Sequence, residues 1–147
     1  AVIPVYHDNR VITTFKLTVK ALENGQDVII FPEKLEKRNH IVYQFQENFV
    51  DVAKLYYKRT GKKAAFVPMY LAPRLHELHF GKPVCFDPDA PLPEERKRIC
   101  DAMAEGITEL ADSLPLHTVV PYENLSPRQY HTNKPREVTV SHEEAGC

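Results

Sequence analysis

The stretch DVIIFPEKLEKRNH, from Asp27 to His40, decides how this sequence is interpreted. Four apolar residues end at Pro32 and Glu33, and a run of charged residues follows. A short apolar run without alternation is typical of a buried strand. Two interpretations of Glu33 are therefore open: it belongs to a functional site at the end of the strand, or it is an exposed loop residue where the strand stops.

Length and composition describe an ordinary globular domain. The 147 residues are 43% apolar and 27% charged, with a formal net charge of −1. This balance argues against a disordered chain and against a nucleic-acid partner, and no apolar run approaches the length of a membrane span. Cys85, Cys100 and Cys147 form no CxxC pair. We therefore expect three reduced thiols in a cytoplasmic protein, without a metal site.

Apolar runs that favour strands recur along the chain. Buried strands are expected at 2–6, 27–31 and 64–72, and Pro68 favours a bulge or an edge position in the last of them. Residues 74–80 and 82–87 are expected to pair with each other as a hairpin. The side chains that we expect to be almost wholly buried are Val28, Ile29, Ile30, Phe66 and Val67.

Helical periodicity occupies the segments between these runs. Helices are expected at 13–25, 47–61 and 91–114. Thr13 or Thr14 would cap the start of the first helix, and Gly61 would close the second. The third helix has an apolar stripe that would face the core, formed by Ile99, Met103, Ile107, Leu110 and Leu114.

Alternating apolar strands and helices are the pattern of an α/β protein with a largely parallel sheet flanked by helices. We assign residues 1–114 to a partial domain of this kind, and residues 115–147, which contain several prolines, to an extended tail. Parallel sheets place their ligand sites beyond the carboxyl ends of the strands. Glu33 would lie at such an end, which is the position of a functional carboxylate.

The segments IPVYHDNR, ALENGQDVIIFPE and FVPMYLAP follow one another in this order. They resemble the second, third and fourth motifs of the glycerophospholipid (lysophospholipid) acyltransferase family, with Phe31, Pro32 and Glu33 at the Phe-Pro-Glu of the third motif. The resemblance covers residues 2–88 and extends through the helix at 94–114. It implies an α/β acyltransferase-like fold with a substrate site at these three residues.

The third motif departs from the family after Glu33. Lys34 and the two residues after it stand where Gly, Thr and Arg are usual, so the phosphate-binding Arg of the motif has no counterpart by position. Lys37 or Arg38 would supply that charge from the following loop. In the second motif, Arg10 is the candidate for a phosphate contact.

In the family's first motif, His-x-x-x-x-Asp, the imidazole is the general base that deprotonates the acceptor hydroxyl. No histidine of this chain has an aspartate five residues later. We therefore predict no catalytic residue within the chain. We interpret the sequence as a fragment whose catalytic motif would precede Ala1, and which would be inactive alone.

The resemblance implies transfer of an acyl chain from coenzyme A or acyl carrier protein to a lysophospholipid or glycerophosphate acceptor. Glu33 would hold the glycerol portion of the acceptor, with Arg10 and Lys37 or Arg38 near its phosphate. No cofactor or metal is expected, because a thioester is already activated. The enzyme would be a peripheral protein at the inner, cytoplasmic face of the membrane. The alternative is a non-catalytic α/β module that binds a phospholipid or a protein.

Overall fold

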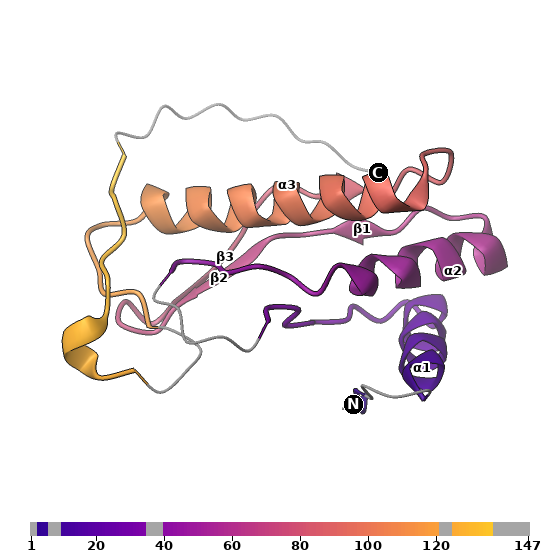
Figure 1. Cartoon of the computed structure of the whole chain (residues 1–147), viewed down its shortest axis with the longest axis horizontal. Coiled ribbons are helices and arrows are strands. Elements are labelled where there is room, and N and C mark those ends of the chain that lie inside the picture. Colours follow the sequence, from indigo (N-terminus) through magenta and orange to yellow (C-terminus); the bar gives the residue numbers. More distant parts are fainter. Residues whose placement is uncertain (1–2, 6–9, 35–39, 121–124, 137–147) are drawn as a thin grey trace.

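The computed structural model describes residues 3–5, 10–34, 40–120 and 125–136. Helices dominate these ranges, and the strands are short (Figure 1). In chain order the elements are α1 (Val11–Glu23), the 3-10 helix η1 (Glu47–Val50), α2 (Asp51–Thr60), β1 (Ala65–Phe66), β2 (Met69–Ala72), β3 (Glu77–Phe80), β4 (Val84–Cys85), α3 (Leu92–Ser113) and the 3-10 helix η2 (Pro127–Gln129).

The three expected helices are confirmed, with small shifts at their ends. Gly61 adopts φ +70° at the C-cap of α2, as expected for a residue that closes a helix in the left-handed region. The predicted cap of α1 is wrong. The helix begins directly after Arg10, and the Thr14 side chain lies inside it, where its hydroxyl donates to the Pro4 carbonyl at 2.8 Å.

The apolar stripe of α3 faces the core as expected. Ile99, Met103 and Leu114 are buried, and Ile107 and Leu110 are partly buried against them. The core has two clusters along this helix. The first joins α3 to η1, α2 and the end of the hairpin, and the second joins the last turns of α3 to β2.

The four strands form one long antiparallel hairpin. β2 pairs with β3, with Met69 opposite Phe80, and β1 pairs with β4, with Phe66 opposite Val84. The Gly81 N–H donates to the Pro68 carbonyl at 2.9 Å and links the two parts. Two residues separate β1 from β2, whereas three separate β3 from β4, and this unequal spacing is a β-bulge. The expected irregularity at Pro68 is confirmed, whereas the expected pairing of 74–80 with 82–87 is wrong.

The predicted α/β fold with a largely parallel sheet is wrong. Every strand pair among the described residues is antiparallel, and residues 27–31 form no strand. Ile29 is 64% exposed, Ile30 and Val67 are also exposed, and Val28 and Phe66 are only partly buried, so the expected burial of these five is wrong. An apolar run becomes a parallel strand only beside a parallel neighbour, whereas a hairpin needs only a short turn.

The helix α3 lies along the hairpin and crosses in front of it in Figure 1. The two come so close that a Cβ added to Gly106 would lie 2.8 Å from Cγ of Pro68, and one added to Gly81 would lie 2.7 Å from the same atom. Glycine is therefore required on both sides of Pro68. A bidentate pair between Arg96 and Asp51, with N–O distances of 2.7 and 2.6 Å, joins α3 to the start of α2.

The segment after α3 returns to the last turn of that helix. Asn133 is 2% exposed, and its Nδ2 donates to the carbonyls of Ala111 and Leu114 at 2.7 and 3.1 Å. Its Oδ1 accepts from the His117 N–H at 2.9 Å. The His117 Nε2 lies 2.8 Å from the Tyr70 hydroxyl. This buried polar cluster ties His117 and Asn133 to β2 and to the end of α3.

The cysteines differ from expectation. Cys100 is free and buried on α3, whereas Cys85 at the end of β4 is disulfide-bonded. The prediction of three reduced thiols is therefore wrong at Cys85.

Candidate functional site

The charged stretch after Pro32 begins in a pair of extended segments. The Gln46 N–H donates to the Pro32 carbonyl and the Lys34 N–H donates to the Gln44 carbonyl, both at 2.8 Å, around an antiparallel bridge between Glu33 and Phe45. Residues 32–34 therefore lie antiparallel to residues 44–46 and do not continue a strand from 27–31. Two of the predicted phosphate contacts, Lys37 and Arg38, lie outside the described residues.

Glu33 is partly buried, and its side chain is oriented by the returning segment. Its Oε1 accepts a hydrogen bond from the Tyr43 N–H at 2.7 Å. Such a charge-assisted bond holds the carboxylate in one position. The antiparallel bridge between Glu33 and the buried Phe45 fixes the backbone at Glu33. Glu33 is thus a positioned carboxylate, although part of its hydrogen-bonding capacity is already used within the chain.

An open groove of about 560 Å³ lies beside this pair of segments. One wall comes from Lys34 and the segment 40–47, and the other comes from Cys100, Asp101 and Ala104 on α3. The Lys34 ammonium donates to the Gln44 amide oxygen at 3.4 Å and lies on the surface of this wall. The groove combines an apolar floor at Phe45 with one lysine, one histidine and two carboxylates at its rim.

The Cys100 thiol in this groove is not an activated nucleophile. Burial raises the pKa of Cys100 to about 11, and the nearby carboxylates of Glu47 and Asp101 act in the same direction. The nucleophilic form of cysteine is the thiolate. At neutral pH Cys100 is therefore a thiol that fills the wall between α3 and the segment 40–47.

The remaining predicted site residues are dispersed. Phe31 is 77% exposed, and Pro32 is partly buried. Arg10 directly precedes α1, whereas the chain enters segment 26–34 from the other end of that helix (Figure 1). The 13 residues of α1 correspond to a length of roughly 20 Å. The structure therefore keeps Phe31, Pro32 and Glu33 together and brings Arg10 to the opposite end of α1 from that segment.

Sequence reasoning did not identify the residues that line the groove. Lys34 was noted only as a departure from a motif, although a lysine next to a positioned carboxylate is itself a signal for an anionic or zwitterionic ligand. Tyr43 and Asp101 carried no such signal, because their contribution depends on segment 40–47 folding back and on its approach to α3. Their role is visible only in three dimensions.

Other properties of the described residues limit the chemistry. Within residues 3–5, 10–34, 40–120 and 125–136, no three His, Cys, Asp or Glu side chains lie close enough to hold a metal ion. None of the helices in these ranges combines the length and the apolar character needed to cross a bilayer. A scan against protein-family models and searches of curated proteins and solved structures found no match to this chain.

Proposed function

We propose that this chain is the acceptor-binding part of an acyltransferase that moves an acyl chain from an acyl thioester to a lysophospholipid or glycerophosphate hydroxyl. One observation carries the proposal: the Phe31-Pro32-Glu33 sequence, in order with two further family-like segments, ends in a partly buried carboxylate, and the next residue, Lys34, lines an open groove. The donor would be acyl coenzyme A or acyl carrier protein.

The chemistry of these residues suits the acceptor. A carboxylate accepts hydrogen bonds from glycerol hydroxyls, and the Lys34 ammonium can pair with a phosphate oxygen as a compact charge. The apolar floor of the groove would contact the first carbons of an acyl chain. Because a thioester is already activated, the reaction needs no metal or redox cofactor. The chain would act at the surface of a membrane as a peripheral protein.

The proposal places the general base outside these 147 residues, because no histidine precedes an aspartate at the spacing of the family's first motif. In this proposal the chain therefore binds the acceptor and does not turn it over by itself. The alternative is a non-catalytic module that binds a phospholipid or a protein. The high exposure of Ile29 and Phe31 favours this alternative, because apolar side chains in that position suit a contact with a partner.

Binding of the acceptor tests the proposal. The chain, labelled with ¹⁵N, is titrated with glycerol 3-phosphate and with a short-chain lysophosphatidate, and the amide shifts are followed. We expect shifts at Lys34, Tyr43 and Gln44. Glu33→Gln and Lys34→Ala should each weaken binding roughly 10-fold or more, the effect of losing a charge-assisted hydrogen bond.

The matched controls are Glu109→Gln on α3 and Lys16→Ala on α1, both exposed. They should bind as the unmodified chain does. Absence of shifts, or equal losses in the controls, would overturn the acceptor site. Thioester release above background by residues 1–147 would overturn the statement that the base lies elsewhere. Binding of the lipid without any effect of Glu33→Gln would favour the non-catalytic module.

A further inference from the structure

The long hairpin has two faces of opposite environment. Pro68, Tyr70 and Ala72 point to α3 and are buried. The residues between them point away, and Leu71 is 59% exposed. Cross-strand partners share a face of a sheet, so Phe80, opposite Met69, and Leu78, opposite Leu71, lie on the same outer side. We call the exposed side chains Val67, Leu71, Leu78 and Phe80 the outer face.

The outer face is apolar, and its side chains are exposed to solvent. Phe80 is 61% exposed, and Val67 and Leu78 are each nearly half exposed. A strand face of this composition normally packs against another layer, because single exposed apolar residues are common but contiguous ones mark a contact surface. The cross-strand register makes Leu71 and Leu78 direct neighbours and places Phe80 on the same face opposite Met69. Val67 precedes Met69 in the same row, because exposure alternates along this strand.

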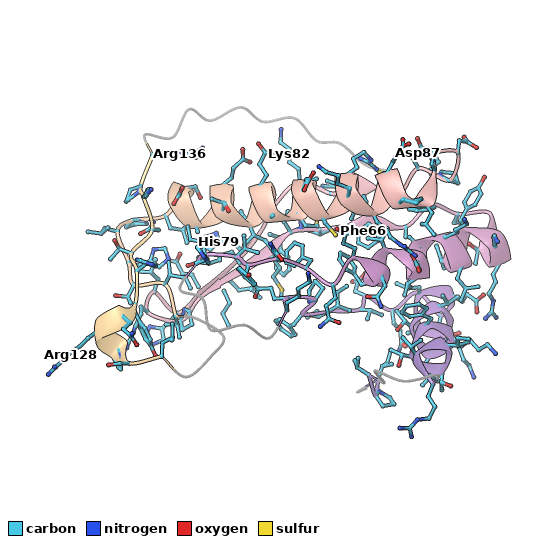
Figure 2. All side chains as sticks on the ribbon, in the orientation of Figure 1. Phe66, His79, Lys82, Asp87, Arg128 and Arg136 are labelled. Carbon is cyan, nitrogen blue, oxygen red and sulfur yellow. The ribbon has the colours of Figure 1, made fainter. Side chains whose placement is uncertain are left out.

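The charged side chains of the hairpin segment itself are mainly basic. Residues 62–86 contain Lys62, Lys63, Arg74 and Lys82 but a single carboxylate, Glu77, although the whole chain has a net charge of −1. Glu77 is bonded to His79 at 2.8 Å, and Tyr70, opposite His79, faces α3, so this pair lies on the helix side of the hairpin. Exposure alternates from Lys63 to Val67, so Lys63 continues the outer row. Figure 2 shows Lys82 extending away from α3.

This charge argues against a second copy of the chain as the occupant. Two hairpins placed face to face would bring like charges together, which costs energy at an interface. A specific dimer also buries roughly 800 Å² on each partner, an area that four side chains do not reach. An apolar stripe with a basic rim instead matches a bilayer with anionic headgroups, which takes apolar side chains below its surface and cations at the headgroups.

We infer that the outer face of the hairpin is the surface by which this chain lies on an anionic lipid bilayer. Phe80, Leu71 and Leu78 enter the region below the headgroups, while Lys63, Lys82 and Arg74 pair with lipid phosphates or carboxylates. The opposite side of the hairpin stays packed on α3, so no refolding is needed. The inference rests on the proposed function for the choice of a lipid as partner, and it assigns that contact to a defined surface.

The experiment uses the whole chain and vesicles of phosphatidylcholine with or without phosphatidylserine, which contain neither a lysophospholipid nor a thioester. Binding is measured by co-flotation. We expect binding to the anionic vesicles and little to pure phosphatidylcholine. Leu71→Ser with Phe80→Ser should weaken binding at least 10-fold. Lys63→Glu with Lys82→Glu should weaken it roughly 25-fold or more, because each cation near an anionic surface contributes about fivefold.

The matched controls are Ile12→Ser and Lys16→Glu, which change an exposed apolar residue and an exposed lysine on α1. Both should bind as the unmodified chain does. An independent readout uses the absence of tryptophan from the sequence. Phe80→Trp should show a blue-shifted emission and quenching by brominated lipid on anionic vesicles, whereas Leu116→Trp, at another exposed apolar position, should show neither.

Several outcomes would overturn the inference. They are no binding to anionic vesicles, binding that the hairpin variants leave unchanged, equal binding to uncharged vesicles, and a Phe80→Trp emission that does not respond to lipid. Self-association of the chain that Leu71→Ser with Phe80→Ser abolishes would identify a homodimer surface instead. Because the vesicles carry no acyl acceptor, these results are independent of whether Glu33 and Lys34 bind glycerol 3-phosphate.

Discussion

Segments 27–31 and 64–72 have the same apolar character in the sequence, but they end in different environments. Residues 65–66 and 69–72 are strands with an antiparallel partner and one face on α3. Residues 27–31 have no strand partner, and Ile29 is 64% exposed. An apolar run therefore reports a tendency to be extended and buried, while the presence of a partner decides whether a strand forms. The following predictions test this contrast, from the largest expected effect to the smallest.

The largest difference in the free energy of unfolding is expected between substitutions at two isoleucines. Ile99 on α3 is fully buried in the core cluster that includes the hairpin end. Ile29 lies in segment 27–31, which has no strand partner, and is exposed. We expect Ile99→Ala to lower the free energy of unfolding by about 2–5 kcal/mol, the cost of a cavity in a packed core. Ile29→Ala should change it by less than about 0.5 kcal/mol. Urea unfolding followed by circular dichroism measures both, and similar losses in the two variants would contradict the assignment of segment 27–31 to the surface.

The next largest loss of stability is expected in the buried polar cluster that ties His117 and Asn133 to the end of α3. Asn133→Ala removes the donor to two helix-end carbonyls and the acceptor for the His117 N–H. Leaving these groups unsatisfied should cost about 1–3 kcal/mol. Asn48→Ala, at an exposed position in η1, is the matched control. Protection of the His117 amide in hydrogen exchange should fall in Asn133→Ala only.

Acid should loosen the contact between α3 and the hairpin end. The Arg98 guanidinium, which donates to both Glu95 oxygens at 2.7 and 2.6 Å, holds the pKa of the Glu95 carboxyl below its usual value, and the Asp87 N–H adds to the effect. A lowered folded-state pKa means that this stabilisation is complete above the unfolded pKa, about 4.3, and is lost as the pH falls through the lower folded value.

The test for Glu95 is a pH series of urea midpoints. The unmodified chain should lose stability below about pH 4.3, and Glu95→Gln should lose less of its own stability over that range. Glu109→Gln, which changes an exposed glutamate of the same helix, should follow the unmodified chain. Parallel pH dependence in all three chains would show that the Glu95–Arg98 pair does not contribute.

The smallest effect concerns the end of α2. Gly61 has φ +70°, and a Cβ there would meet no atom within 4 Å. Gly61→Ala should therefore cost about 1 kcal/mol from backbone strain alone. Gly106→Ala, where the added Cβ would lie 2.8 Å from Pro68, is the informative comparison, because it adds a steric clash with the hairpin. It should cost more than Gly61→Ala in the same thermal unfolding experiment.

Much of the local structure could be predicted, and the reason is that it depends on neighbours in the sequence. The three helices, the closure of α2 at Gly61 and the irregularity at Pro68 follow from periodicity, glycine and proline within a few residues. The stripe from Ile99 to Leu114 followed from helical spacing in the same way. The strand partner of residues 77–80 did not follow, because the predicted partner 82–87 and the observed partner 69–72 are both acceptable on local grounds.

The candidate site shows the same division. Glu33 was found from the Phe-Pro-Glu sequence, and its neighbour Lys34 could have been included for its charge. The bond from the Tyr43 N–H and the wall of the groove at Asp101 could not be found, because they require a chain reversal and the approach of α3. Conversely, Arg10 was grouped with Glu33 by motif order, although α1 separates it from segment 26–34.

The sequence by itself therefore determined where helices form, which stripe of α3 is apolar and which carboxylate follows the apolar run, because these depend on contacts within a few residues. The tertiary structure alone decided the antiparallel pairing, the exposure of segment 27–31 and the outer face of the hairpin. The physical reason is that hydrogen-bonded strand pairs and buried area are properties of two segments at once. An apolar run has no single outcome until the chain supplies, or does not supply, the surface that would cover it.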